Sequence, residues 1–460
     1  MNVDTVIRGG QIATAEATYR ADIGITDGRI SVVADRIECE NVIDVDGCIV
    51  MPGAIDVHTH FDTELGDSRT ADDYESGSRA AAFGGITTYV NYAFQGEGES
   101  LVGTIAREIA KAEPNSYLDH SFHPVVTRVN DEILGELETI RDDGFTSLKV
   151  FTAVPGFQLS DDELLAVLRR AAETGVLVNV HAEDGALIES LTRALLAEGR
   201  TEMDAITAAR PDVAEGLATE KMGIYGGELR CPIYFVHLSS IAALEAARRA
   251  RVRGAEIYIE TRPVYLFLDA GCYCLPGREA RKFVAWPPLR RKADQEALWQ
   301  ALARGEIQTY ATDHTTWTLE QKTDPALDFA SVPGGVSNVE SLVGMLYSEG
   351  VKPGRISLNR FVSVISTNPA KLFGMWPRKG TITVGADADL TVIDPERHMR
   401  IESERMQSRS DFDPYEGQEA VGWPVKTILR GRVVVDDGAL LVEPGYGDLI
   451  RRRGYERLCV

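Results

Sequence analysis

The chain has 460 residues, 44% hydrophobic and 26% charged, and its 48 Lys and Arg against 70 Asp and Glu give a formal net charge of −22. This composition is typical of a folded globular protein and excludes a disordered chain, while the acidity disfavours nucleic acid and a polybasic membrane surface as partners. Because no apolar run approaches the roughly 20 residues of a membrane span and the first residues lack a signal-peptide pattern, we expect a cytoplasmic protein that binds neither nucleic acid nor a membrane.

Both ends of the chain predict short β-strands joined by tight turns. In residues 1–50, the Asp27-Gly28 pair separates two β-rich runs, which is a hairpin signal. Residues 377–460 show the same pattern, with another such turn at Asp437-Gly438. We therefore predict that the two ends form one small β-module that brackets a central domain, residues 51–376.

The central domain alternates β-rich runs with amphipathic helical stretches. One predicted helix covers 161–173, with Ser160 as its N-cap, and another covers 241–253. Strict alternation predicts a parallel sheet, and the count of eight favours a closed (β/α)8 barrel over an open doubly wound sheet. The predicted strands are 54–60, 87–93, 119–126, 146–151, 176–183, 232–240, 256–262 and 309–314.

Residue types that bind metals fall near the carboxyl ends of five of these strands. They are His58, His60, Lys149, His181, His237 and Asp313. Because all carboxyl ends meet at one face of a barrel, we expect these side chains to converge there. The His-x-His pair is the strongest single signal, since residues two apart on a strand point to the same face.

The other histidines are interpreted differently. His120, His123 and His398 lack this placement and are interpreted as structural. Strand alternation points His314 away from Asp313, so we expect it to support or pack against the site rather than bind an ion.

Lys149 is compatible with a metal site only if its amine is converted to a carbamate. An ammonium among imidazoles would repel a cation, and the run around it is apolar, so an unpaired charge there is unfavourable. A surface or salt-bridged lysine is the alternative interpretation. If burial keeps the amine neutral, carbon dioxide can carbamylate it, and the new carboxylate can bridge two ions about 3.5–4 Å apart. The imidazole and carboxylate ligands predict two divalent ions, with Zn²⁺ favoured.

These motifs together resemble the amidohydrolase superfamily, and within it the hydantoinase/dihydropyrimidinase group of cyclic amidases. The matching segments occur in the group's order along the chain: 51–61, 84–88, 148–151, 180–183, 236–240, 259–261, 287–290, 311–314, 368–374 and 379–390. The resemblance implies a distorted (β/α)8 barrel, a β-sandwich built from both termini, and a binuclear metal centre. It also implies a homo-oligomer, a tetramer or a dimer.

The same resemblance implies a role for each candidate ligand. His58 and His60 would bind one ion, His181 and His237 the second, and carbamylated Lys149 would bridge them. Asp313 would bind the first ion and act as general base for a bridging hydroxide. The implied reaction is hydrolysis of a cyclic amide, such as a hydantoin or dihydropyrimidine, to an N-carbamoyl amino acid.

Three positions depart from the group's pattern, and each falls where substrate contacts are expected. Val154 stands where many relatives carry a Tyr that assists the oxyanion, and Trp286 where a Ser is usual. Arg262 replaces a neutral residue and can recognise a substrate carboxylate or form a salt bridge with a nearby acid. The segment 329–340, with Gly334 and Asn338, corresponds to a further substrate contact, largely through backbone.

Several functions remain open at this point. Allantoinase is one alternative, because allantoin is itself a substituted hydantoin, and a divergent amidohydrolase acting on another cyclic or linear amide is a second. Dihydroorotate is disfavoured, since Asp62 stands where dihydroorotase-like enzymes usually place an Arg. A non-catalytic scaffold homologue is a third alternative, but all six ligand positions are filled, which favours catalysis.

Overall fold

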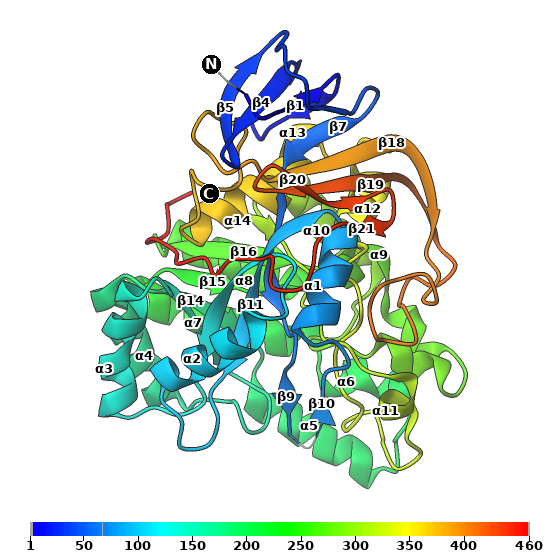
Figure 1. The fold of residues 1–460 in the computed structure, drawn as a ribbon. Coiled ribbons are helices and arrows are strands. Elements are labelled where there is room, and N and C mark those ends of the chain that lie inside the picture. The colour runs from blue at the N-terminus through cyan, green and yellow to red at the C-terminus, as the bar shows by residue number, and fades with distance from the viewer. Residues whose placement is uncertain (1–2, 67, 459–460) are drawn as a thin grey trace.

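The computed structural model describes residues 3–66 and 68–458, and its centre is a parallel barrel (Figure 1). Eight parallel strands pair in the order β17-β16-β15-β14-β13-β12-β11-β8. A parallel bridge between Thr59 and His314 joins the first strand to the segment after the last. The predicted barrel is thus confirmed, and the open sheet is wrong. The strands are β8 (Ala54–Thr59), β11 (Ile86–Phe94), β12 (Asp119–Val125), β13 (Ser147–Phe151), β14 (Leu177–His181), β15 (Ile233–Phe235), β16 (Ile257–Thr261) and β17 (Thr309–Tyr310).

Helices between the strands cover the outside of the barrel (Figure 1). The predicted cap of α4 is confirmed: the Ser160 hydroxyl accepts from the Glu163 N–H, and the Glu163 carboxylate accepts from the Ser160 N–H. The α-helices are α1 (Tyr74–Phe83), α2 (Leu101–Ala112), α3 (Asp131–Asp142), α4 (Asp161–Thr174), α5 (Gly185–Ala197), α6 (Ile206–Ala209), α7 (Asp212–Leu229), α8 (Ile241–Val252), α9 (Pro263–Phe267), α10 (Lys292–Arg304), α11 (Leu319–Thr323), α12 (Leu342–Leu346), α13 (Leu358–Val362) and α14 (Asn368–Leu372).

Strands from both ends of the chain build the β-module. One sheet contains β5 (Arg29–Ala34), β4 (Asp22–Thr26), β1 (Thr5–Arg8) and β6 (Val42–Asp44). The other contains β21 (Ala439–Leu440), β20 (Arg432–Asp436), β19 (Glu419–Leu429), β18 (Leu390–Arg400), β7 (Ile49–Pro52), β2 (Gln11–Ala13) and β3 (Thr18–Arg20). Met51 of β7 pairs with Thr391 of β18, and Ile12, Val50 and Leu390 share one apolar core. The two termini therefore fold as one unit, as the turn pattern predicts.

The β-module and the open face of the barrel lie at opposite ends of the molecule. Because β8 follows β7 almost directly, its amino end starts at the β-module and its carboxyl end points away from it. The short hairpin of β9 (Glu64–Leu65) and β10 (Ser68–Arg69) lies at that far end (Figure 1). The carboxyl ends of the strands therefore open away from the β-module.

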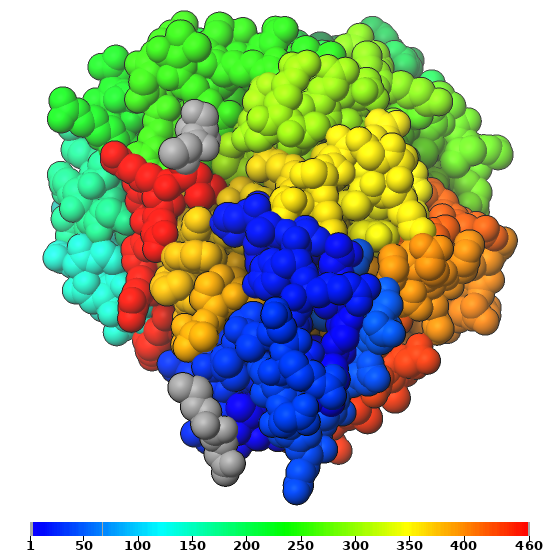
Figure 2. Space-filling model, turned by 90° about the horizontal axis from the view of Figure 1, so that it is seen from above, coloured from blue at the N-terminus to red at the C-terminus, as the bar shows by residue number. Residues whose placement is uncertain are grey.

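The C-terminal segment returns along the barrel. In Figure 2 it runs in red over the surface, between the cyan-green barrel segments and the yellow-orange ones. Its backbone is anchored where the Ile450 N–H donates to the His120 carbonyl at 2.7 Å and the Arg452 N–H to the Gly144 carbonyl at 2.8 Å. Among the described helices, none combines the length and the apolar character that crossing a membrane demands.

Two barrel strands end well before their predicted last residues, 240 and 314. β15 stops at Phe235 and β17 at Tyr310, so His237 and Asp313 lie on the loops that follow. Both residues have left-handed backbone, with φ of 42° and 51°. Such a conformation cannot continue a strand, and non-glycine residues adopt it at an energetic cost, often at functional sites.

Candidate metal centre and active site

One group of candidate ligands meets at Asp313. Its Oδ1 lies 3.1 Å from Nε2 of His58 and 3.0 Å from Nε2 of His60. The three side chains are buried, and their ligand atoms all lie within 4.8 Å of one another. Two imidazole nitrogens and a carboxylate oxygen that converge on one point form a donor set suited to a divalent ion.

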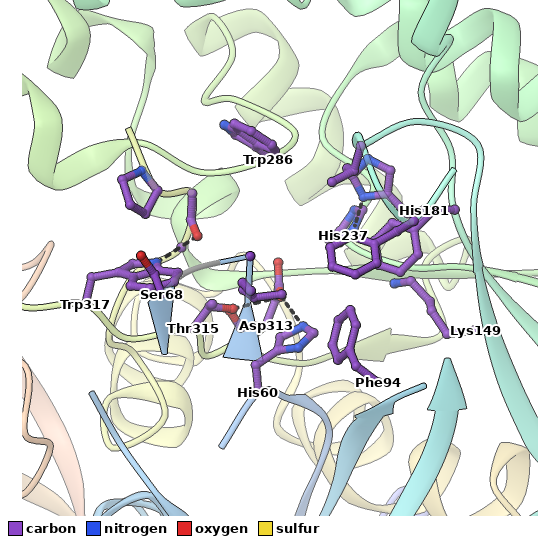
Figure 3. A pocket seen from close by; sticks show the side chains of 18 of the residues that line it. His60, Ser68, Phe94, Lys149, His181, His237, Trp286, Asp313, Thr315 and Trp317 are labelled. Carbon is purple, nitrogen blue, oxygen red and sulfur yellow. Dashed lines mark hydrogen bonds and ion pairs between the residues drawn. The ribbon is translucent and has the colours of Figure 1, made fainter. Parts of the chain in front are cut away.

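The second group lies across the same cavity. Nδ1 of His181 is 3.0 Å from Nε2 of His237, so the two rings direct nitrogens toward each other. The Lys149 amine lies over the rings of Tyr92 and Phe151, at 4.7 Å and 5.0 Å from their centroids. Figure 3 shows Lys149 next to the two histidines, with His60 and Asp313 nearby. The barrel thus brings all six predicted residues to one place.

Buried carboxylates orient the histidine rings. Nδ1 of His58 is 2.6 Å from Oε1 of Glu260, which also accepts the backbone N–H of His237 at 2.9 Å. Nε2 of His181 is 2.9 Å from Glu183, which in turn pairs with Arg210. A carboxylate behind a histidine fixes the ring and raises its basicity as a ligand.

These two carboxylates contact the candidate ligands and were not among the site residues predicted from the sequence. Glu260 lies on β16, one residue before its end, and Glu183 follows β14 by two residues. The rule that identified the histidines, a polar residue at a strand's carboxyl end, applies to both and was a usable signal.

Burial controls the charge of the candidate ligands. It lowers the pKa of His60 to about 4 and that of Lys149 to about 7, although nearby acids oppose both shifts. It also lowers the pKa values of His181 and His237. Neutral imidazoles keep a lone pair for a cation, and an uncharged amine can react with carbon dioxide. These residues therefore fit a binuclear centre with a carbamylated lysine.

The charges around His58 and Asp313 also favour a cation. Burial lowers the pKa of His58, but Glu260 and Asp313 outweigh it and hold the value above its ordinary one. Burial raises the pKa of Asp313, yet Arg262 and the histidines hold it well below its usual range. Asp313 is therefore ionised at neutral pH, as a metal ligand requires.

The site opens into a cavity of about 390 Å³. Its walls combine the candidate ligands with apolar side chains, among them Leu65, Phe94, Phe157 and Trp317. A volume of this size, mostly apolar with a few convergent polar groups, suits a small organic ring.

The predicted substrate contacts divide into two groups. Val154, Trp286 and Gly334 line the cavity. Arg262 lines it too, but Nη1 donates to Oδ2 of Asp313 at 2.5 Å, so the salt-bridge alternative is the one that the structure has. Asn338 lies outside the lining, and its Nδ2 donates to the Thr312 carbonyl at 3.1 Å.

The remaining histidines are placed as the sequence predicts. His314 lies behind the site, with Nε2 2.9 Å from Asp72 and Nδ1 accepting the backbone N–H groups of Asn338 and Val339. His120 and His123 are buried, and His398 is exposed on β18. None of these lines the cavity among the residues that are described.

Comparison with known proteins identifies the family. The Amidohydrolase family profile matches residues 49–434. The D-hydantoinase of Geobacillus stearothermophilus is 41% identical over 98% of this chain and 97% of its own, and that of Ralstonia pickettii is 40% identical over 99% and 100%. The crystal structure of a dihydropyrimidinase from Brevibacillus agri NCHU1002 superposes with a TM-score of 0.97 at 38% identity, covering 99% of this chain and all of that one. The chain therefore belongs to the amidohydrolase family, and its relatives there are hydantoinases and dihydropyrimidinases.

Proposed function

We propose that this protein is a metal-dependent hydrolase that opens a hydantoin or dihydropyrimidine ring to an N-carbamoyl amino acid. One observation carries the proposal: the side chains of all six candidate ligands meet at one cavity of the right size. A scaffold protein has no need for this buried arrangement of imidazoles, carboxylate and amine. The hydantoinase and dihydropyrimidinase relatives support the same reaction.

The proposed centre holds two divalent ions, most simply Zn²⁺. His58, His60 and Asp313 would hold one ion and His181 and His237 the other, with Lys149 as a carbamate between them. When bound, the ions supply a water of near-neutral pKa and polarise the carbonyl of the substrate. The lowered pKa of Lys149 supports the carbamate, because only an unprotonated amine adds carbon dioxide.

Asp313 is the proposed general base. It takes a proton from the attacking water as the water oxygen bonds to the ring carbonyl carbon. When the ring C–N bond breaks, Asp313 returns that proton to the leaving nitrogen, and a carboxylic acid and an N-carbamoyl group remain. Arg262 keeps Oδ2 of Asp313 occupied, which leaves Oδ1 directed toward the histidines.

The wall residues set how the ring is held. Val154 has no side-chain hydrogen-bond donor, so it cannot assist the oxyanion as a tyrosine would. Gly334 allows the backbone to pack closely against Trp286, because a Cβ at this position would lie 3.0 Å from the Trp286 indole. We propose that the ring amide is recognised mainly through backbone in the segment around Gly334, with Asn338 supporting it from behind.

A combined metal and substrate assay tests the proposal. The purified, metal-loaded protein is assayed with hydantoin, 5-substituted hydantoins, dihydrouracil, allantoin and dihydroorotate. We expect about two ions per chain and ring opening of hydantoins or dihydrouracil. Less than one ion per chain with no turnover would contradict the proposal, and turnover of allantoin alone would identify an allantoinase.

The assembly and the location are also proposed. We propose a homo-oligomer, a tetramer or a dimer, in the cytoplasm. Light scattering coupled to size-exclusion chromatography tests the first, and a monomer at micromolar concentration contradicts it. Cell fractionation tests the second.

A further inference from the structure

Two neighbouring strands of the barrel separate directly below the proposed metal centre. Among the described residues, β12 and β13 are paired at a single position, Val125 with Lys149. By contrast, β11 pairs with β12 from Thr88 to Phe94, and β13 pairs with β14 from Ser147 to Phe151. The barrel wall therefore has a gap on the amino side of Lys149, where backbone groups need another partner.

The C-terminal tail, residues 444–458, lies in this gap. Leu449 forms a parallel bridge with His120 on β12. The Arg452 N–H donates at 2.8 Å to the carbonyl of Gly144, shortly before β13. The tail thus contacts both edges of the gap and replaces part of the missing ladder with its own backbone hydrogen bonds.

The Arg452 side chain spans the gap. On the β12 side, Nε donates to the Ser121 hydroxyl at 3.0 Å and Nη2 to the Phe122 carbonyl at 2.6 Å. On the β13 side, Nη1 donates to the Ser147 hydroxyl at 2.8 Å. The side chain is buried, and these oxygens are all uncharged. Burying a guanidinium without a carboxylate is costly, so the exact placement of this group calls for a reason.

Two routes lead from this guanidinium to the candidate ligands. Ser147 and Lys149 are two apart on β13, so both point into the barrel, with Lys149 one layer, about 6.6 Å, farther along the strand. The Ser147 hydroxyl also lies 2.6 Å from Nδ1 of His123. The other nitrogen of that ring is 3.1 Å from the Val57 carbonyl, one residue before His58. The guanidinium thus supports the strands that carry a lysine and a histidine of the proposed centre.

We propose that Arg452 is a positioning residue for the metal centre. By joining β12 to β13 across the gap, the guanidinium holds Lys149 at the depth where its carbamate can serve both ions. Its positive charge also favours the carbamate, because carbamylation adds a negative charge above a cation that has no carboxylate partner of its own. The inference rests on the proposed function and adds to it a residue that touches neither substrate nor metal.

The variant Arg452→Met tests this role, because methionine keeps an unbranched side chain in the gap but has neither donors nor charge. The exposed neighbour supplies the matched control, Arg453→Met. Each full-length protein is stripped of metal and reconstituted with zinc and isotope-labelled bicarbonate. Carbon NMR follows the carbamate, and competition with a chelator measures metal affinity. We expect Arg452→Met to bind metal about 10- to 100-fold more weakly with a reduced carbamate signal, and Arg453→Met to match the wild type.

A second variant tests the route through β13. Ser147→Ala removes one partner of the guanidinium and leaves the tail in place, so we expect a smaller loss of metal affinity. The double variant should lose no more affinity than Arg452→Met alone, because both changes break the same contact. Fully additive losses would show that Arg452 does not act through Ser147 and would overturn the proposed route.

The outcomes separate this inference from the proposed function. A wild type that has metal and carbamate but opens no ring contradicts only the proposed reaction, since affinity and label still report on Arg452. A wild type with neither metal nor carbamate overturns both. Wild-type affinity and label in folded Arg452→Met, or an equal loss in Arg453→Met, would overturn the inference alone. Should Arg452→Met not fold, unchanged metal affinity in Ser147→Ala would overturn it as well.

Discussion

Arg262 and Asp313 form a buried ion pair at the proposed active site. Nη1 of the arginine donates to Oδ2 at 2.5 Å, and Nη2 donates to the Asp313 carbonyl at 3.3 Å. The guanidinium is fully buried, while Oδ1 contacts the two histidines of the His-x-His pair. Oδ2 of Asp313 therefore binds Arg262 while Oδ1 faces the histidines, and Arg262 determines which oxygen faces the site.

The first prediction concerns this pair. Arg262→Gln should lower kcat about 10- to 100-fold, because the carboxylate loses the group that orients it. KM should change less, since the guanidinium is engaged by Asp313 rather than by substrate. Steady-state kinetics with metal analysis measures both. Arg262→Lys is the matched control. It keeps the positive charge but loses the planar pair of guanidinium donors, so we expect a kcat between those of Arg262→Gln and the wild type. Wild-type kcat in Arg262→Gln would contradict the positioning role.

The second prediction concerns Lys149. Lys149→Ala should abolish turnover and reduce bound metal, because the carbamate is lost. In wild-type protein stripped of metal, added bicarbonate should speed reconstitution at pH 8, where an amine with a pKa of about 7 is mostly neutral. Recovery of activity after metal addition measures the rate. Lys149→Arg keeps a cation that cannot be carbamylated and should stay inactive with or without bicarbonate. Normal turnover in Lys149→Ala would rule out the bridge.

The third prediction concerns the carboxylate behind the histidines. Glu260→Gln should weaken metal binding about 10- to 100-fold, since Glu260 holds Nδ1 of His58 and the backbone of His237. Competition with a chelator measures the affinity. Glu256 lies just before the same strand and accepts from the Tyr258 hydroxyl, so Glu256→Gln is the control and should bind metal normally. Equal affinities in the two variants would show that Glu260 has no such role.

The fourth prediction concerns stability and pH at Glu340. Burial raises the pKa of this carboxyl to about 8 from an ordinary 4.5, with Asp413 and Asp72 adding to the effect and the Gln407 N–H opposing it. The folded state thus retains a proton that the unfolded chain releases. Between pH 4.5 and pH 8 this group alone should lower the free energy of unfolding as pH rises, by up to about 1.4 kcal/mol per pH unit.

Glu340→Gln should remove that pH dependence. The variant should match the wild type near pH 4.5 and exceed it increasingly toward pH 8, as measured by urea unfolding at several pH values. Exposed Glu349 provides the control, because Glu349→Gln should follow the wild-type curve. A constant difference between Glu340→Gln and the wild type across this range would mean that Glu340 does not titrate there.

Local patterns were sufficient to predict the order of strands and helices and the candidate ligands. Alternation of strands and helices predicted the barrel, and turn pairs predicted the β-module. The candidate ligands could be predicted because a strand's carboxyl end can be located in the sequence and the barrel brings all such ends together. Ser160 is a single-residue example. An N-cap bonds to backbone in the first turn of its own helix, so no distant contact is needed to identify it.

Contacts between distant segments were decided only by the tertiary structure. His58 and Glu260 are 202 residues apart in sequence, and Arg262 and Asp313 are 51 apart, so no local pattern contains either pair. Asn338 donates a hydrogen bond to the Thr312 carbonyl instead of lining the cavity, and no local pattern indicates this. The sequence by itself determined which residues could hold metal and at which end of the barrel, because that depends on strand direction. Which oxygen of Asp313 faces the histidines, and which side chains line the cavity, depend on the packing of segments that are distant in the chain.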